Sequence, residues 1–443
     1  MEETVLEQRK HKVLFVGLVW PEPQSTAAGQ NILSYINFFI ASGCEVTFAC
    51  AAEQTEQSAP LTSLGVKEQA ITLNDSSFDT FVNQLAPDIT VFDRFISEEQ
   101  FGWRVSLAAP MCMKILDCED LHFLRDARHQ AYKDINQRGN NVVCNDVDNA
   151  YLYSDMCKRE LASIWRCDLS ILLSEYEYKL LSRIFKVPET LLHCCPFLLS
   201  DVDNKATKTY EQRVDFVSIG SFRHAPNWDA VLTLKQKIWP TINRALPHAR
   251  CHIYGSYLTP KAKQLENKKQ GFLVHGFVED AKEVIGNARI LLAPLNFGAG
   301  IKGKLVDAMQ CYTPSITTEI GSEGLLPLAD NIDNVRELWP GAINNVQHSC
   351  DAFIESCIAL YANEDKWTQA SMRCHTLYSS IFNYERQSRE LSDSIATIRT
   401  NLTKHRHQHF IGQVLQHHTL NSTKYMSQWI EAKTRLQQAQ RSD

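Results

Sequence analysis

The residues with the clearest chemical potential lie in one glycine-rich stretch, Ala293-Pro-Leu-Asn-Phe-Gly-Ala-Gly-Ile-Lys-Gly-Lys-Leu-Val-Asp-Ala-Met309. An apolar segment ends at Pro294, three glycines follow, and a helical pattern then begins. Glycines let backbone N–H groups approach an anion closely, and a helix N-terminus carries partial positive charge. Lys302 and Lys304 add full charges at the same place. The stretch therefore favours a diphosphate over a neutral ligand.

A carboxylate follows the lysines on the same expected helix. Asp307 lies three positions after Lys304, about one helical turn, so the two side chains are expected to share a face. Asp307 could accept hydrogen bonds from the vicinal hydroxyls of a ribose. The alternative is a glycine turn before a solvated helix, with the lysines and the aspartate as surface charges.

Polar residues also follow predicted strands in the first half. Asp117-Cys-Glu-Asp120-Leu-His122 comes directly after one strand, and Asp117 and Asp120 could orient His122, receive an acceptor or cap the next helix. Gln24-Ser-Thr-Ala-Ala-Gly29 precedes a helix, where Ser25 or Thr26 could simply be the cap. Ser174-Glu175-Tyr-Glu177 has the spacing of a capping box.

Alternating apolar strands and helical stretches must position these residues, a pattern typical of a parallel sheet wound on both faces. The expected strands of the first half are Lys12–Leu18, Glu45–Cys50, Asp88–Phe92, one opening at Lys114–Leu116, and Leu169–Leu173. Its expected helices are Gly29–Ser42, Phe78–Leu85, Ser154–Trp165 and Glu175–Phe185, with a polar loop at Lys133–Asn149. The second half repeats the pattern with strands Asp215–Ile219, Arg250–Tyr254, Phe272–His275, Ile290–Ala293 and Ser315–Thr318, and helices Trp228–Ile238, Ala281–Asn287 and Gly303–Gln310.

A polar stretch without periodicity, Ser200–Gln212, separates the two halves. We expect domains at 1–200 and 213–380, a linker at 201–212, and a helical extension at 381–443. Two doubly wound halves bind ligands in the cleft between the carboxyl ends of their strands.

Composition excludes several classes of protein. The 443 residues are 44% hydrophobic and 22% charged, which fits a folded chain and excludes collagen-like or disordered ones. The net charge of −6 predicts no general affinity for nucleic acid. No apolar run reaches the roughly 20 residues of a membrane span. His405, His407 and His409 lack a completing ligand, so we expect a solvated or interface helix and no metal site.

Five segments in order resemble a known family: Gly220-Ser-Phe-Arg-His-Ala-Pro-Asn227, Tyr254-Gly255-Ser256, His275-Gly276-Phe277, Phe297-Gly-Ala-Gly-Ile-Lys-Gly-Lys304 and Ile320-Gly-Ser-Glu-Gly324. Together they resemble the donor domain of GT-B glycosyltransferases, in particular the retaining glycosyltransferase family 4. The resemblance implies a GT-B fold: two doubly wound, Rossmann-like domains, the first on the acceptor side and the second holding the donor, with C-terminal helices that return across the first.

The resemblance also assigns roles to residues. It implies donor binding by Gly220, Ser221, Gly255, Gly298, Gly300, Ile301, Lys302 and Asp307, an acceptor-side set of Gly29, Asp117 and Asp120, and catalytic roles for His122, Arg223 and Lys304. Two family glutamates eight positions apart are replaced here by Ala299 and Asp307. Contact with the transferred sugar is therefore expected from backbone N–H groups at 298–301.

The implied activity is metal-independent, retaining transfer of a hexosyl-type sugar from a nucleotide-diphosphate sugar to a glycan, a lipid-linked molecule or a protein, with no cofactor. The implied location is the cytoplasm, free or peripheral at the inner face of the membrane. Two alternatives keep the fold: a nucleotide-sugar epimerase, and a non-catalytic nucleotide-sugar-binding or scaffold protein, which Ala299 favours.

Overall fold

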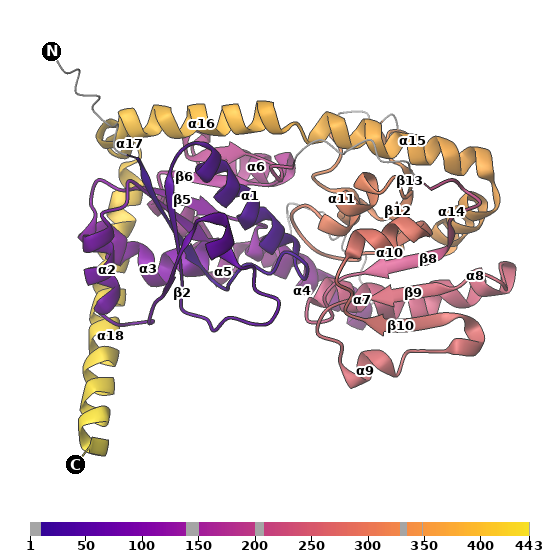
Figure 1. Ribbon diagram of the computed structural model, residues 1–443, viewed down its shortest axis with the longest axis horizontal. Helices are drawn as coiled ribbons and strands as arrows, with labels where there is room; N and C mark the ends of the chain where they lie inside the picture. Colours follow the sequence, from indigo (N-terminus) through magenta and orange to yellow (C-terminus); the bar gives the residue numbers. More distant parts are fainter. Residues whose placement is uncertain (1–9, 139–149, 200–207, 328–334, 348, 443) are drawn as a thin grey trace.

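Two parallel sheets organise the protein (Figure 1). The computed structural model describes residues 10–138, 150–199, 208–327, 335–347 and 349–442. The first sheet has the order β3-β2-β1-β4-β5-β6-β7 and the second the order β10-β9-β8-β11-β12-β13. Every pairing between named strands is parallel, so each sheet has one edge at which all the strands end.

The elements of the first domain are β1 (Lys12–Gly17), α1 (Ala27–Ala41), β2 (Glu45–Cys50), η1 (Leu61–Leu64), β3 (Lys67–Ala70), α2 (Ser77–Leu85), β4 (Ile89–Asp93), α3 (Arg94–Ala108), β5 (Met113–Asp117), α4 (His122–Arg138), η2 (Ala150–Tyr153), α5 (Asp155–Arg166), β6 (Leu169–Leu172), α6 (Glu175–Lys179), η3 (Leu180–Ile184), η4 (Glu189–Leu191) and β7 (Leu192–Cys194).

The elements of the second domain are β8 (Val214–Ile219), α7 (Ala225–Thr233), η5 (Leu234–Ile238), α8 (Trp239–Ala245), β9 (Cys251–Tyr254), α9 (Pro260–Lys263), η6 (Lys268–Gln270), β10 (Phe272–Gly276), α10 (Ala281–Asn287), β11 (Ala288–Ala293), α11 (Gly303–Gln310), β12 (Ser315–Thr317), α12 (Glu319–Ser322), β13 (Gly341–Ile343), α14 (Asp351–Ala362) and α15 (Glu364–Ile381). The chain ends in α16 (Tyr384–Thr400), α17 (Leu402–Gln408) and α18 (Phe410–Ser442).

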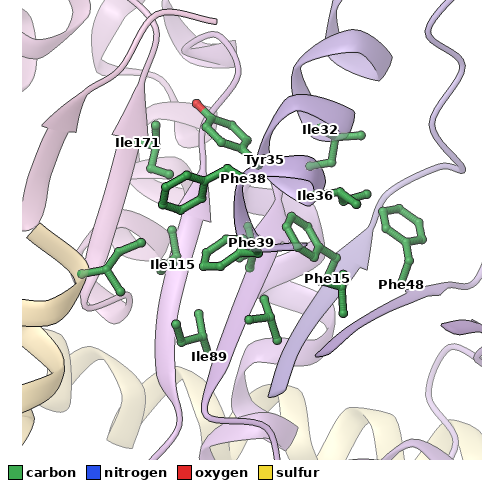
Figure 2. Packing of buried hydrophobic residues seen from close by; sticks show 14 of the residues in the cluster. Phe15, Ile32, Tyr35, Ile36, Phe38, Phe39, Phe48, Ile89, Ile115 and Ile171 are labelled. Carbon is green, nitrogen blue, oxygen red and sulfur yellow. The ribbon is translucent and has the colours of Figure 1, made fainter. Parts of the chain in front are cut away.

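Both faces of the first sheet are covered, as its apolar strands require. In β1, Val13 and Phe15 point to the cluster under α1, whereas Leu14 and Val16 belong to the cluster on the opposite face. Figure 2 shows Phe15 between the sheet and the α1 residues Phe39 and Ile36. This double burial explains why the strand is nearly continuous in apolar residues.

The C-terminal helices tie the two domains together. Helix α15 packs against α11 of the second domain. After it, α16 crosses to the first domain (Figure 1), where Leu391, Ile395 and Ile398 enter the core cluster that contains Val13. Helix α18 then lies along α5 and α3.

Most of the expected elements are confirmed, three of them residue for residue: Glu45–Cys50 is β2, Ala281–Asn287 is α10 and Gly303–Gln310 is α11. The expected loop at Lys133–Asn149 is wrong at its start, because α4 continues to Arg138; residues 139–149 lie outside the described ones. The polar sequence of α4 is compatible with a helix because only one of its faces packs, through Phe123, Leu124 and Ala127. Of the expected linker, 201–207 also lies outside the described residues.

No helix within the described residues combines the length and apolar character that crossing a bilayer demands.

Candidate functional site

The beginnings of three helices from the two domains meet at one place. A Cβ on Gly303, the first residue of α11, would lie 2.7 Å from the Ala27 Cβ at the start of α1. A Cβ on Gly300 would lie 2.7 Å from the Cβ of Asp120, which comes two residues before α4. Helix N-termini carry partial positive charge and free N–H groups. Their convergence makes this junction favourable for an anion.

The glycine loop has backbone conformations and approaches that suit glycine. Gly300 has φ 63°, a left-handed value that side-chain-bearing residues rarely adopt, and Gly298 has φ 148°. The N–H of Gly300 donates to Oε1 of Glu177 (3.1 Å), and the carbonyl of Gly298 accepts from Nη1 of Arg128 (2.7 Å). The first domain therefore holds the loop through both backbone polar groups.

Lys302 and Lys304 point into this junction and not into bulk water. The ammonium of Lys302 donates to the carbonyl of Gly300 (2.6 Å), and that of Lys304 donates to Oδ1 of Asn227 (2.7 Å). Desolvation lowers the pKa of Lys302 to about 8, although Glu323 opposes it. Desolvation, helped by the positive charge of Lys302, lowers the pKa of Lys304 to about 7. Two desolvated cations side by side are costly unless an anion joins them.

The glycines that directly follow β8 and β9 leave room for the ammonium group of Lys304. A Cβ on Gly220 would come within 2.8 Å of the Lys304 ammonium and 2.6 Å of Nδ2 of Asn227. A Cβ on Gly255 would lie 2.2 Å from the carbonyl oxygen of Gly220, a backbone clash. The carbonyl of Ser221 accepts from the same Asn227 amide (3.2 Å). The structure thus brings Gly220, Ser221 and Gly255 together beside Lys304.

Asp307 lies farther along α11, buried to 8% exposure. Burial raises its pKa to about 6, and its nearest charges are Lys282 and Asp280 at the start of α10. The side chain therefore points toward α10, while the Lys304 ammonium points toward Asn227. Ile301 packs in the second domain's core beside Leu305.

His122 is the first residue of α4 and lies at the same junction. Its Nε2 is 3.6 Å from Oδ1 of Asp120, and its ring packs edge-to-face on Phe95. Burial lowers the pKa of His122 to about 4, so the imidazole is neutral at pH 7. Burial would raise the pKa of Asp120, but Arg125 and His122 lower it to about 2. A charged carboxylate and a neutral imidazole therefore stand side by side.

Asp117 lies deeper than an acceptor contact requires. It is fully buried with Asp93 and Glu119, and these three carboxylates come close enough to one another to hold a cation. Burial, reinforced by Asp93, raises the pKa of Asp117 to about 8, and Arg94 pairs with Asp93. The guanidinium already supplies a positive charge, so we read this cluster as support for the strand end and not as a metal centre.

Two other expected residues lie at the margin of the junction. Arg223 is exposed, and its guanidinium lies 3.7 Å from the centre of the Tyr257 ring. Tyr257 in turn donates to Oε2 of Glu22 in the first domain (2.9 Å). A Cβ on Gly29 would lie 2.6 Å from the carbonyl oxygen of Glu22. The hydroxyl of Thr26 caps α1 by accepting from the N–H of Gly29 (3.0 Å). The capping alternative for Thr26 is confirmed.

Three charged residues at the junction make contacts between the domains that the sequence did not indicate. Arg128 is 1% exposed and forms two hydrogen bonds with Glu323 (2.8 and 2.6 Å), joining α4 to the second domain. Glu177, fully buried, accepts from the N–H groups of both Leu121 (2.9 Å) and Gly300. The Ser174 capping box is confirmed, and it correctly predicted where α6 begins. Its spacing did not predict that Glu177 also contacts Gly300 of the other domain.

Ala299 packs between the domains. It is 8% exposed and belongs to the first domain's cluster with Leu121 and Phe123. His129 of α4 stacks on Phe297 of the same loop at 4.3 Å. The position at which the family carries its first glutamate is therefore an apolar contact between the domains in this chain.

Two cavities, of about 410 and 370 Å³, lie elsewhere, beneath α18 on the first domain. Lys114 and Arg166 line both. Arg166 pairs with Glu98, and the Lys114 ammonium donates to Oγ of Ser106 (3.0 Å).

Residues 213–363 match the family Glycosyl transferases group 1. No curated protein gives a significant sequence match. Among solved structures, Anabaena HepE in complex with UDP and glucose aligns with a TM-score of 0.61 at 12% identity, covering 87% of this chain and 100% of that one. A glycosyltransferase from Rickettsia africae gives 0.58 at 13% identity, with 90% and 99% covered. Sucrose-phosphate synthase from Thermosynechococcus elongatus gives 0.59 at 12% identity, with 88% and 99% covered.

These likenesses agree with the architecture, in which two parallel sheets face a shared junction and helices return across the first domain. The family match covers the domain that contains the glycine loop and both lysines. The chain therefore has the two-domain GT-B fold, and residues 213–363 form a glycosyl transferases group 1 domain within it.

Proposed function

We propose that the protein transfers a hexosyl-type sugar from a nucleoside diphosphate sugar to an acceptor, with retention of anomeric configuration and without a metal ion. The observation that carries this proposal is the pair of desolvated ammonium groups, Lys302 and Lys304, at the start of α11 and between the two domains. HepE was solved with UDP and with UDP-glucose. That supports UDP as the first nucleotide to test.

The lysines stabilise the leaving group. When the bond between the anomeric carbon and the diphosphate oxygen breaks, negative charge grows on the diphosphate and positive charge on the sugar. Lys302 and Lys304, protonated beside the diphosphate, and the N–H groups that begin α11 supply positive charge in a site that is already desolvated. Asp307 lies on the same helix but faces α10, so its contact with a ribose stays a prediction.

The acceptor oxygen bonds to the anomeric carbon on the face that the diphosphate leaves, and its proton passes to the departing phosphate. The neutral imidazole of His122 has one N–H; with that N–H on Nε2, 3.6 Å from Oδ1 of Asp120, its Nδ1 accepts from a hydroxyl of the transferred sugar. Glycan, lipid-linked and protein acceptors all remain within this proposal. Contacts of the first domain with the loop exclude water and so limit hydrolysis.

The Lys304→Ala variant tests the assignment. We expect hydrolysis and transfer of UDP-sugars to fall by about 100-fold or more, because one preorganised charge at a leaving group contributes about that much. The fold should hold, because burial of the Lys304 ammonium is costly in the free protein. The measurement is release of UDP, with circular dichroism as the check on folding.

Lys366→Ala, at an exposed position in α15, is the matched control and should leave turnover unchanged. Unchanged turnover in Lys304→Ala would refute the site. Conversion of the donor to an epimer without any acceptor would instead establish the epimerase alternative.

A further inference from the structure

Helix α18 attaches to the first domain by one face only. Gly412 lies so close to α5 that a Cβ would come 2.0 Å from the Trp165 carbonyl oxygen. Ser427 is 2% exposed and accepts from Nη2 of Arg104 (2.9 Å). Glu431 accepts from the hydroxyl of Ser76 (2.8 Å). These contacts fix which face of α18 is turned away from the protein.

The outward face is apolar and aromatic. Tyr425, Trp429 and Leu436 are 65%, 60% and 63% exposed, and Val414 lies on the same side. At about 100° per residue these four positions fall within one narrow stripe opposite Ser427. Met426, 58% exposed, lies beside the stripe. Figure 1 shows that the end of α18 continues past α2, away from the rest of the first domain.

Basic residues flank the stripe. Between positions 424 and 436 the sequence has Lys424, Lys433 and Arg435 against a single acid, Glu431, a balance of 3 − 1 = +2. The Lys433 ammonium lies 5.1 Å from the centre of the Trp429 ring. Glu431 is turned inward to Ser76 and pairs with Arg435. The outward side is therefore cationic, although the whole chain carries −6.

We propose that the outward face of α18 binds the surface of an anionic lipid bilayer, lying in the interface without crossing it. Tyrosine and tryptophan have an apolar body and a polar tip, which suits the headgroup level, and flanking lysines attract anionic headgroups. A second copy of the chain fits less well, because two surfaces of the same positive sign would then face each other. The helix holds the first domain, and with it the acceptor side of the site, at the lipid surface.

Sedimentation of the full-length protein with lipid vesicles tests this proposal. Wild type should bind vesicles of phosphatidylcholine mixed with phosphatidylglycerol, should not bind phosphatidylcholine alone, and should be released as salt rises. The double substitution Tyr425→Ala and Trp429→Ala keeps helix propensity and should weaken binding by about tenfold or more. Lys424→Gln with Lys433→Gln should weaken it as well.

Met372→Ala is the matched control, because Met372 is 66% exposed on α15 and lies outside the stripe. It should bind vesicles as wild type does. Equal binding to neutral vesicles, no binding by wild type, or undiminished binding by the aromatic double variant would overturn the proposal. So would a dimer in light scattering that the aromatic double variant dissociates, which would assign the stripe to a second copy.

Discussion

At the scale of single residues, the junction gains its chemistry from two lysines whose pKa values are lowered by burial. The pKa of Lys304 is lowered to about 7 by desolvation and by Lys302, and no carboxylate acts on it. Lys302 is opposed by Glu323 but remains near 8. Lysine in water titrates near 10.4, so both groups are poised to gain a proton when an anion arrives.

The affinity for UDP should therefore depend on pH. Below pH 7 both lysines are largely protonated in the free protein, and at pH 7 Lys304 is about half protonated. Above pH 7, binding must bring protons to neutral lysines, so affinity falls by up to about tenfold per pH unit for each lysine until the higher pKa of the complex is reached. Calorimetric titration with UDP from pH 7 to pH 9 measures this, since a terminal phosphate with pKa near 6 is already ionised there.

Lys304→Arg provides the comparison, because a guanidinium stays charged throughout that range. The part of the fall in UDP affinity with pH that comes from position 304 should disappear in this variant. An equal change of UDP affinity per pH unit in wild type and Lys304→Arg would exclude Lys304 as the titrating group.

At the scale of elements, the start of α4 is held by buried carboxylates. Oε1 of Glu160 accepts from the N–H of His122 (3.1 Å) and Oε2 from that of Phe123 (2.9 Å). Glu177 accepts from Leu121 just before the helix. Side chains from α5 and α6 thus cap the helix whose first residue is His122, and they fix the position of that imidazole.

Glu160→Ala should destabilise the protein by about 2–3 kcal/mol, because two buried N–H groups lose their acceptor. Glu160→Gln keeps one amide oxygen and should lose about half as much. Denaturant unfolding monitored by circular dichroism gives both values. Equal stability of wild type and Glu160→Ala would show that the α4 start does not depend on this cap.

The sequence predicted an element well where the residues that mark it lie within the element or next to it. Helix α11 is marked by glycines before it and apolar positions within it, so its bounds followed directly from the sequence. Helix α3 was missed because Glu98 and Arg104 are buried in it, which breaks its apolar period. Strand β3, Lys67–Ala70, was missed because it is a polar edge strand.

At the scale of the whole molecule, the two domains are in direct contact around the glycine loop. Arg128 joins Glu323 and the carbonyl of Gly298, and Ala299 packs into the first domain's core. The lysines of the loop were visible in the sequence because glycine and charge occur together there. The contact between Arg128 and Glu323 was not visible in the sequence, because these residues are 195 positions apart and only the fold brings them together.

The central claim is that Lys304, where the two domains meet, holds a diphosphate. Titration calorimetry with UDP, UMP and uridine tests it most directly, using wild type and Lys304→Ala. We expect wild type to bind UDP more tightly than UMP by about tenfold or more, and Lys304→Ala to lose most of that difference while its affinity for uridine is unchanged. A UDP-to-UMP ratio that is the same in both proteins would contradict the account.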